Sequence, residues 1–305
     1  MTATVALSGV GKRFRTVEAV RDVSFSLDEG EIVALVGHNG AGKTTLMKLM
    51  LGLIQPTAGS VRVLGEDPAS GAFAARRRLG FLPESVSFNT ALTGRETLAF
   101  YARLKGEPVS EALALLERVG LGAAGSRRVG TYSKGMRQRL GLAQALIGAP
   151  RVLLLDEPTT GLDPALRQSF YEILQELRCR GATILLSSHA LSELEGETER
   201  VVIMNRGAMV ADGSLAELRR LARLPVRVRL TAAGGLDGLA GRFADFGPLQ
   251  RVNGHAVEIA VDDARKIEVV RRALADETRI EDIEVTPPSL DELYAHFLRS
   301  GEARP

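Results

Sequence analysis

Cysteine and histidine are scarce in this chain of 305 residues, which contains a single cysteine, Cys179, and four histidines. One thiol cannot build a disulfide framework or a cysteine-based metal site, and it fits a reducing compartment. The histidines are scattered and lack the short spacing of metal ligands. These shortages exclude disulfide-stabilised scaffolds and cysteine metal clusters.

Long apolar runs and a charge of one sign are missing as well. No stretch approaches the roughly 18 consecutive apolar residues of a membrane span, and no charged and then hydrophobic leader opens the chain. We therefore expect a cytoplasmic protein that neither spans a membrane nor is exported. The formal net charge is +2, with acids and bases interspersed, so no basic stripe indicates nucleic-acid binding.

What the chain does contain is a glycine-rich segment, GHNGAGKT at 37–44, between an apolar run at 31–36 and a run of helix formers at 45–51. Glycines let the backbone adopt strained dihedrals and turn successive N–H groups around an anion. Lys43 would add a charge for the β and γ phosphates of a nucleotide, and the Thr44 hydroxyl could ligate magnesium. The alternative is a glycine-rich turn with a chance lysine, but the strand-to-helix context favours a phosphate loop.

Two adjacent carboxylates, Asp156 and Glu157, end a second apolar run at 152–155. The run is typical of a strand buried on both faces, where unpaired acids are costly to desolvate. A divalent cation removes this objection. Asp156 would then hold magnesium, and Glu157 would accept a hydrogen bond from a water that attacks the γ phosphate. The alternative is a strand end whose acids simply face water.

A third signal is the segment YSKGM at 132–136, followed by a helical run at 137–146. Ser133 and Gly135 at a helix start make either a second anion site or a simple N-cap. A lone histidine, His189, follows the apolar run at 183–186. Taken alone, such a histidine is more often a core residue than a catalytic one.

The order of these segments resembles that of the nucleotide-binding subunits of ATP-binding cassette (ABC) transporters, over roughly residues 4–220. The resemblance implies ATP and Mg²⁺ as cofactors. It implies that the nucleotide contacts Phe14, which would stack on adenine, and Gly37, His38, Asn39, Gly40, Ala41, Gly42, Lys43, Thr44 and Thr45. It assigns magnesium to Thr44, Glu84 and Asp156, and catalysis to Lys43, Glu157 and His189. In the family, the signature segment of a second copy closes over the phosphates, which implies a homodimer with Ser133 and Gly135 in that role.

Three positions depart from the family pattern. Glu84 stands where the family usually has glutamine, and its charge beside the triphosphate is expected to alter magnesium dependence. Lys134 replaces the first glycine of the signature, and it would point either toward the γ phosphate or to solvent. Phe14 has an alternative role as a core residue of an edge strand. Asp163, followed by Pro164, is predicted to cap a helix, which does not conflict with its place in the motif order.

The predicted fold is α/β: a P-loop NTPase core of the ABC ATPase type over 1–220, with a helical subdomain at about 85–150, and a small α+β ferredoxin-like domain over 221–305. Strands are predicted at 225–230 and 279–285, a hairpin at 249–261, and helices up to 246 and at 264–275. The second domain would serve either dimerisation and regulation or the sensing of a ligand.

These features predict an ATP-hydrolysing subunit at the inner face of the cell membrane, powering a separate permease that would dock on the helical subdomain near Phe88, Leu92 and Phe100. Two alternatives are a soluble ABC-type ATPase acting on ribosomes or DNA and a regulatory module without turnover. Within the family, the run at 81–88 and the C-terminal extension resemble the ATPase subunit of the transporter that matures the copper sites of nitrous oxide reductase. That likeness would add a periplasmic or copper-handling partner reached through the permease.

Overall fold

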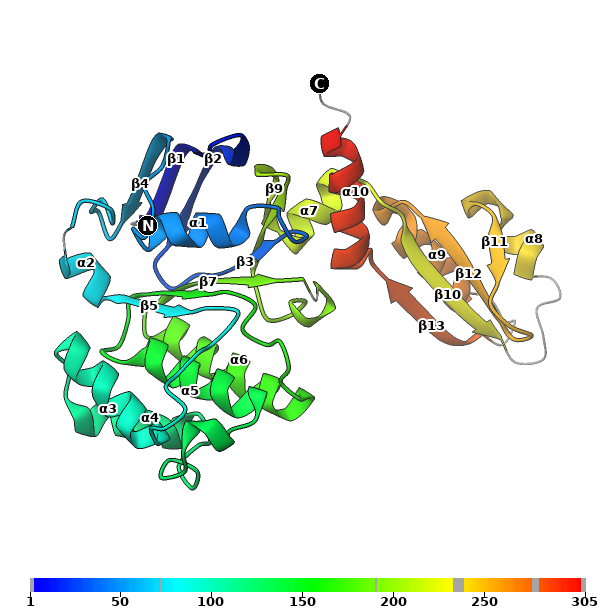
Figure 1. Ribbon diagram of the computed structural model, residues 1–305. Coiled ribbons are helices and arrows are strands. Elements are labelled where there is room, and N and C mark those ends of the chain that lie inside the picture. Colours follow the sequence, from blue (N-terminus) through cyan, green and yellow to red (C-terminus); the bar gives the residue numbers. More distant parts are fainter. Residues whose placement is uncertain (1–2, 72, 190, 233–238, 276–279, 303–305) are drawn as a thin grey trace. The chain divides into compact units, whose positions relative to one another are not determined.

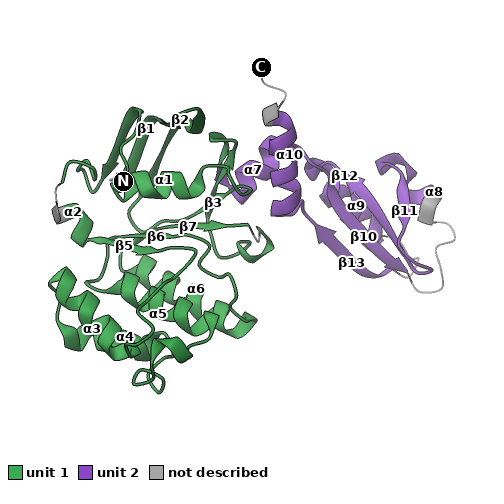
Figure 2. Cartoon of the chain, in the orientation of Figure 1, with its two compact units in different colours: residues 1–212 green, residues 213–305 purple. Residues whose placement is uncertain are grey.

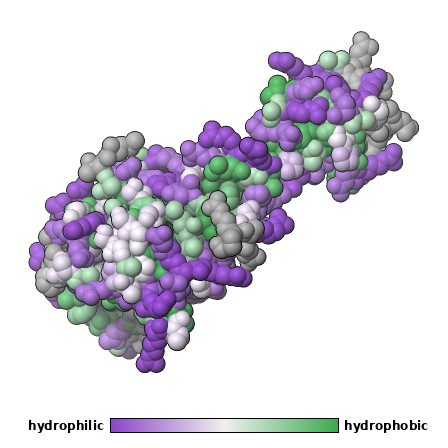
Figure 3. All heavy atoms as spheres, turned by 90° about the horizontal axis from the view of Figure 1, so that it is seen from above, coloured by the Kyte–Doolittle hydropathy of each residue, from purple (hydrophilic) through white to green (hydrophobic). Residues whose placement is uncertain are grey.

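The computed structural model describes residues 3–71, 73–189, 191–232, 239–275 and 280–302 (Figure 1). The chain divides into two compact units, residues 1–212 and residues 213–305 (Figure 2). On the face seen in Figure 3, hydrophilic and hydrophobic side chains are intermixed on both units. Within the described ranges, no helix combines the length and the apolar character that a membrane span requires.

The centre of unit 1 is a six-stranded sheet in the order β5-β6-β7-β3-β8-β9. Its strands are β5 (Leu79–Leu82), β6 (Val152–Leu155), β7 (Thr183–Ser188), β3 (Ile32–Val36), β8 (Arg200–Asn205) and β9 (Ala208–Ser214). The neighbours from β5 to β8 are parallel. Every residue of β3, β6 and β7 is buried, as expected for aliphatic strands covered on both faces.

A second, antiparallel sheet covers one face of this central sheet. It consists of β1 (Ala3–Phe14), β2 (Val17–Asp28) and β4 (Ala58–Val63), in the order β2-β1-β4. Together with helix α1 (Lys43–Met50), it encloses an apolar core that includes Val5, Leu46 and Leu185. A buried hydroxyl pair joins the two sheets, because Thr4 Oγ1 lies 2.7 Å from Thr183 Oγ1.

Helices cover the other face (Figure 1). They are α5 (Lys134–Leu146) and α6 (Pro164–Cys179), with α3 (Gly94–Lys105) and α4 (Val109–Arg118) packed against α5. Shorter helices are α2 (Phe73–Arg77), η1 (Val129–Thr131) and η2 (Leu191–Glu193). Helices α3, α4 and α5 fall within the segment predicted as a helical subdomain. Helix α3 starts with a capping box between Thr93 and Glu96, which satisfies N–H groups of its first turn.

Unit 2 contains a four-stranded antiparallel sheet in the order β11-β12-β10-β13. Its elements are α7 (Leu215–Ala222), β10 (Val226–Ala232), α8 (Leu239–Phe243), η3 (Ala244–Phe246), β11 (Leu249–Arg251), β12 (Ala256–Val261), η4 (Asp263–Arg265), α9 (Lys266–Ala275), β13 (Ile280–Thr286) and α10 (Leu290–Glu302). Alternate residues of β10 are buried, so one face of the sheet packs into a core around Leu230, Phe243 and Val269. Residues 233–238 and Arg279, which fall within predicted elements, lie outside the described residues.

Candidate functional site

The glycine-rich loop joins the buried strand β3 to helix α1. Gly40 and Gly42 have φ angles of 87° and 104°, in the left-handed region that residues with a Cβ rarely adopt. A Cβ on Gly42 would also lie 2.6 Å from the carbonyl oxygen of Ala19, whereas one on Gly40 would meet nothing within 4 Å. The loop backbone therefore depends on glycine at both positions, for strain at Gly40 and for strain and space at Gly42.

Gly37 is needed for a different reason from the one the sequence indicates. It is not among the described residues with a positive φ, so the expectation of a strained backbone is wrong at this position. A Cβ there would lie 2.7 Å from the carbonyl oxygen of Met204 and 2.8 Å from the Cβ of Ala41. Close packing of the loop against β8 therefore requires this glycine.

The loop borders a cleft of about 600 Å³, a volume in the range of small-molecule sites. The cleft is lined by Val17, Glu18, Ala19, His38, Asn39, Gly40, Ala41, Gly42, Lys43, Thr44, Thr45, Glu84, Asp156, Glu157 and Arg206. The fold thus brings Glu84, Asp156 and Glu157 from two other strand ends to the glycine loop. This lining does not include five of the predicted site residues: Phe14, Gly37, Ser133, Gly135 and His189.

Lys43 is the buried cation of the cleft. Its Nζ donates a hydrogen bond to the carbonyl oxygen of Gly37 and lies 3.7 Å from Glu157 Oε1. Both side chains of this ion pair are more than nine-tenths buried. An amine held at the base of a glycine loop can meet phosphate oxygens that enter the cleft.

Asp156 is held by hydroxyl groups on both of its carboxylate oxygens. Thr44 Oγ1 donates to Asp156 Oδ2 over 2.7 Å, and Ser187 Oγ donates to Asp156 Oδ1 over 2.6 Å. The Thr44 hydroxyl and a carboxylate oxygen therefore lie side by side at the cleft. This pair of oxygens fits magnesium, which typically takes one or two carboxylates and completes its shell with water and substrate phosphates.

Glu157 combines a strained backbone with a buried carboxylate group. Its φ is 49°, a left-handed value that is uncommon for a non-glycine residue and frequent at functional sites. Its Oε2 lies 2.7 Å from His189 Nδ1. Its Oε1 is buried and accepts no hydrogen bond from the part of the chain that the structure describes. An oxygen of this kind can accept a proton from a water beside the phosphates.

The remaining predicted residues lie on neighbouring elements. Ser133 caps helix α5, its Oγ accepting from the N–H of Met136, and Asp163 caps α6 as predicted. The stem of Lys134 lies against Gly161. Phe14 ends β1 with 45% of its surface exposed, so its alternative role as a core residue is wrong. Its adenine contact stays a prediction.

The sequence interpretation missed Ser187 and the lining residues from β2. Ser187 lies one residue beyond Leu186, which pairs in register with Leu155, so the hydroxyl faces Asp156. The available signal was a polar residue at the end of an otherwise apolar run. Val17 and Ala19 reach the cleft from an antiparallel hairpin, and no local pattern marks them.

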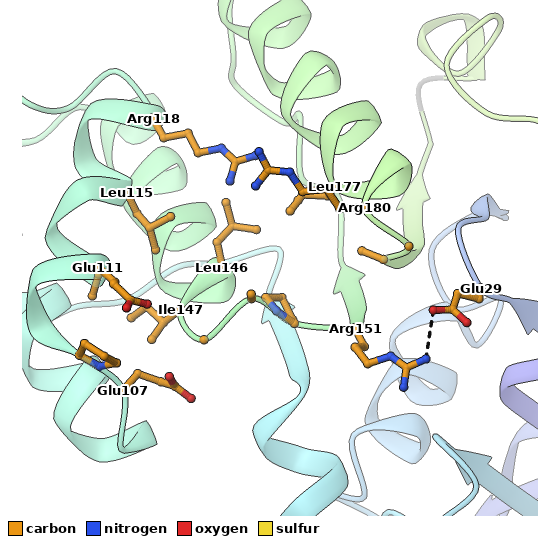
Figure 4. A pocket seen from close by; sticks show the side chains of 17 residues that line it. Glu29, Glu107, Glu111, Leu115, Arg118, Leu146, Ile147, Arg151, Leu177 and Arg180 are labelled. Carbon is orange, nitrogen blue, oxygen red and sulfur yellow. Dashed lines mark hydrogen bonds and ion pairs between the residues drawn. The ribbon is translucent and has the colours of Figure 1, made fainter.

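A further cleft of about 360 Å³ lies between α4, the loop after α5 and the end of α6 (Figure 4). Its arginines are already paired. Arg151 lies 3.1 Å from Glu29, and Arg118 and Arg180 both contact Glu176. Since its cations are neutralised by neighbours, we assign it no ligand.

A glycine loop between a buried parallel strand and a helix, with an acidic residue after another parallel strand of the same sheet facing the same cleft, defines a P-loop nucleotide hydrolase. A family model described as ABC transporter matches residues 20–160. Two curated proteins extend the match over most of the chain. A "Doxorubicin resistance ATP-binding protein" of Mycobacterium tuberculosis is 33% identical over 304 residues, covering 95% of this chain and 92% of that protein. A "Nod factor export ATP-binding protein I" of Burkholderia thailandensis is 37% identical over 271 residues, covering 87% and 88%.

A solved structure supports the same assignment. The chain titled "Structure of ATP binding subunit of ABC transporter" superposes with a TM-score of 0.68 and 32% sequence identity, over 72% of this chain and 93% of that one. The chain belongs to the family of ABC transporter ATP-binding proteins. It is an ATP-hydrolysing, nucleotide-binding subunit, a class that works with membrane permease partners.

Proposed function

We propose that this chain is the ATPase subunit of an exporter of the ABC type, working as a homodimer with magnesium beside a separate permease at the inner face of a membrane. One observation carries the catalytic part of the proposal. Glu157 Oε1, which accepts no hydrogen bond from the described residues, and the Thr44–Asp156 oxygen pair face one cleft, together with the glycine loop. The export direction is supported by the name of one curated relative, the Nod factor export ATP-binding protein.

The described residues divide the work of ATP hydrolysis. The loop N–H groups and Lys43 bind and orient the phosphates. To reach them, Lys43 Nζ gives up its present contacts with Gly37 and Glu157 in favour of phosphate oxygens. Thr44 and Asp156 would hold magnesium, with Glu84 at the same cleft. When bound, magnesium neutralises charge on the phosphates. Glu157 Oε1 accepts a hydrogen bond from the attacking water, and His189 holds the other oxygen of that carboxylate.

The homodimer is supported by the absence of Ser133 and Gly135 from the lining of the cleft. Ser133 and Gly135 are expected at the phosphates, but they stand at the start of α5 and do not line their own chain's cleft. A second copy would supply them across the interface. Helix α5 connects back to the catalytic loop, because Gln138 Nε2 donates to the carbonyl oxygen of Pro158 over 3.2 Å.

The permease contact is supported by exposed apolar residues at the helical layer. Phe100 and Leu104 on α3 are 54% and 73% exposed, and Leu53 is 64% exposed. Leu53 and Leu104 border a cleft of about 510 Å³. Phe88 packs edge-on against Tyr101, with ring centroids 6.0 Å apart. The docking surface therefore centres on Phe100 and Leu104 rather than on Phe88.

For unit 2 we infer a ferredoxin-like domain. The element order β10, α8, β11, β12, α9, β13 and the sheet order β11-β12-β10-β13 support it, since the split βαβ arrangement has this connectivity. Its role in dimerisation, regulation or ligand sensing stays a prediction.

The copper-handling partner also stays a prediction. The names of the two curated relatives mention doxorubicin and Nod factor. Within the described ranges, no group of three or more His, Cys, Asp or Glu side chains is placed to hold a metal ion. The proposal of a ribosome- or DNA-directed ATPase has no support among the relatives named above.

The proposal is tested by recovering partners from membranes. Tagged full-length protein carrying Glu157→Gln is incubated with solubilised membranes of its source, magnesium and ATP, because slowed hydrolysis should preserve the assembled complex. We expect an integral membrane protein to co-purify, and the yield to fall when Phe100→Ser and Leu104→Ser are added. Recovery of ribosomes or DNA in its place would contradict the proposal.

A further inference from the structure

A buried hydroxyl on β7 contacts both acidic residues that follow β6. Ser187 is completely buried. Its Oγ donates to Asp156 Oδ1 over 2.6 Å and accepts from the backbone N–H of Glu157 over 2.9 Å. A serine hydroxyl has one proton and two acceptor positions, so it can make both contacts at once.

The contact to Asp156 leaves that carboxylate little freedom to rotate. Its Oδ2 accepts from Thr44 on helix α1, while its Oδ1 accepts from Ser187 on β7. The carboxylate is therefore held by two different elements, one on each of its oxygens. Loss of the Ser187 hydroxyl would leave Oδ1 buried without this donor, and the plane of the carboxylate would no longer be set.

The contact to Glu157 acts on a strained backbone. Glu157 has a φ of 49°, a conformation that persists only where the surroundings hold it. Ser187 fixes this backbone by accepting a hydrogen bond from the N–H of Glu157. His189, two residues further along the chain, contacts the carboxylate oxygen Oε2 of Glu157 twice. Its backbone N–H donates to this oxygen over 3.3 Å, and its Nδ1 lies 2.7 Å from it. The end of β7 thus sets both the backbone and the side chain of Glu157.

We propose that Ser187 is a positioning residue, which fixes the Asp156 carboxylate for magnesium and the Glu157 backbone for the attacking water. This inference rests on the proposed function, because it takes Asp156 as a magnesium ligand and Glu157 as the proton acceptor. Ser187 contacts neither the nucleotide nor the metal in this scheme. Outer contacts of this type orient the residues that do, and their removal typically costs about 10- to 100-fold in metal affinity or activity.

The test compares two variants of nearly equal volume in the full-length chain. Ser187→Thr keeps the hydroxyl, and Ser187→Val has the same branched shape without it. Metal binding is measured without turnover, by titrating Mn²⁺ and following its electron paramagnetic resonance signal in the presence of ADP. Hydrolysis is measured against magnesium concentration. Nucleotide affinity is measured in EDTA.

We expect Ser187→Val to weaken metal binding and to slow hydrolysis, each by about 10- to 100-fold, with unchanged nucleotide affinity in EDTA. Ser187→Thr should stay close to wild type in all three measurements. Thr183→Val is the matched control, because Thr183 is a buried hydroxyl on the same strand that donates to the carbonyl oxygen of Asp28, away from the cleft. It should lower the melting temperature and leave the metal affinity unchanged.

The proposal is overturned if Ser187→Val equals Ser187→Thr in metal affinity and in rate. Should Ser187→Val fail to fold, Ser187→Ala takes its place, and wild-type metal binding by that variant overturns the proposal equally. A wild-type protein that neither binds metal with nucleotide nor hydrolyses ATP would instead overturn the proposed function. If wild type binds metal and hydrolyses ATP while the Ser187 variants match it in both, only the proposal about Ser187 fails and the proposed function stands.

Discussion

The sheets of the two units bury their apolar residues in opposite ways. In unit 1, β3, β6 and β7 are buried throughout, and the only polar residues in these three strands are Thr183, Ser187 and Ser188 of β7. In unit 2, β10 alternates between buried and partly exposed residues, so its other face carries charges. There Arg229 lies 3.4 Å from Glu258 and 3.3 Å from Glu284.

This difference means that the proposed catalytic groups lie in unit 1, while the charges on the sheet of unit 2 have a structural role. Charged residues after the strands of unit 1 converge on one cleft, where Glu157 keeps an oxygen that accepts no hydrogen bond from the described residues. The acids and bases on the sheet of unit 2 neutralise each other along neighbouring strands, as cross-strand pairs commonly do. We therefore expect substitutions at the cleft of unit 1 to change ATP turnover, and substitutions in the core and ion pairs of unit 2 to change stability.

The largest effect should come from Glu157→Gln. Removal of the proton acceptor should lower the rate of ATP hydrolysis by about 100-fold or more, while ATP still binds and stabilises the dimer. Phosphate release and size-exclusion chromatography measure the two properties. Glu172→Gln, an exposed acid on α6, is the control and should keep the wild-type rate. Normal hydrolysis by Glu157→Gln would show that another group activates the water.

Phe243→Ala tests the other side of the comparison. Phe243 is completely buried in the core of unit 2, so truncation should lower the free energy of unfolding of that unit by about 3–5 kcal/mol. Urea unfolding measures this loss, and nucleotide affinity should stay unchanged. The exposed Leu221→Ala should have little effect on either. A weaker nucleotide affinity in Phe243→Ala would break the separation between the two units.

Lys43→Ala should weaken nucleotide binding by about 10- to 100-fold, because a hydrogen bond between charged groups contributes roughly 2 kcal/mol. A fluorescent ATP analogue measures the affinity. Lys48→Ala removes an exposed lysine from the same helix and should bind normally. Equal affinity in both variants would contradict the role of the glycine loop.

Glu292→Gln should have the smallest effect. Burial alone would raise the pKa of Glu292, but hydrogen bonds from Ser289 and Arg227 lower it below the ordinary value of 4.5. Its stabilisation is therefore present above that ordinary pKa and is lost as pH falls through the lower folded-state pKa. Because both side chains of the Arg227–Glu292 pair are 39% exposed, solvent screening limits the loss in Glu292→Gln to about 0.5 kcal/mol at pH 7.

Urea unfolding at pH 7 and at about pH 3 should show that the difference between wild type and Glu292→Gln shrinks with acidification. Asp291→Asn, on the adjacent exposed position of α10, controls for the loss of a negative charge. A difference that grows toward low pH would contradict the pKa direction.

Local patterns predicted the parts of the site that are contiguous in sequence. The phosphate loop lies between a strand and a helix, and Asp156 and Glu157 follow a buried strand. Residues that depend on strand pairing could not be predicted in this way. Ser187 reaches Asp156 only because β7 lies beside β6, and Ala19 meets Gly42 only through the fold of the hairpin.

The same limit applies to element ends and to the second copy. The strand predicted at 225–230 occupies Val226–Ala232, because its last residues are fixed by pairing with β12 and β13 rather than by their own pattern. The sequence does not specify the second copy that Ser133 and Gly135 are proposed to face. Their role, like that of Phe14, is open to experiment.

The position of β3 in the central sheet has a consequence for synthesis of the protein. Its neighbours are β7 and β8, which the ribosome makes only after the whole helical layer. A nascent chain that has reached residue 150 already contains the glycine loop, but the strand that supports this loop has no partner. Such delayed, non-local pairing is slow and exposes apolar strands to misassembly. Nucleotide binding should therefore become possible only late in translation, when β7 and β8 pair with β3.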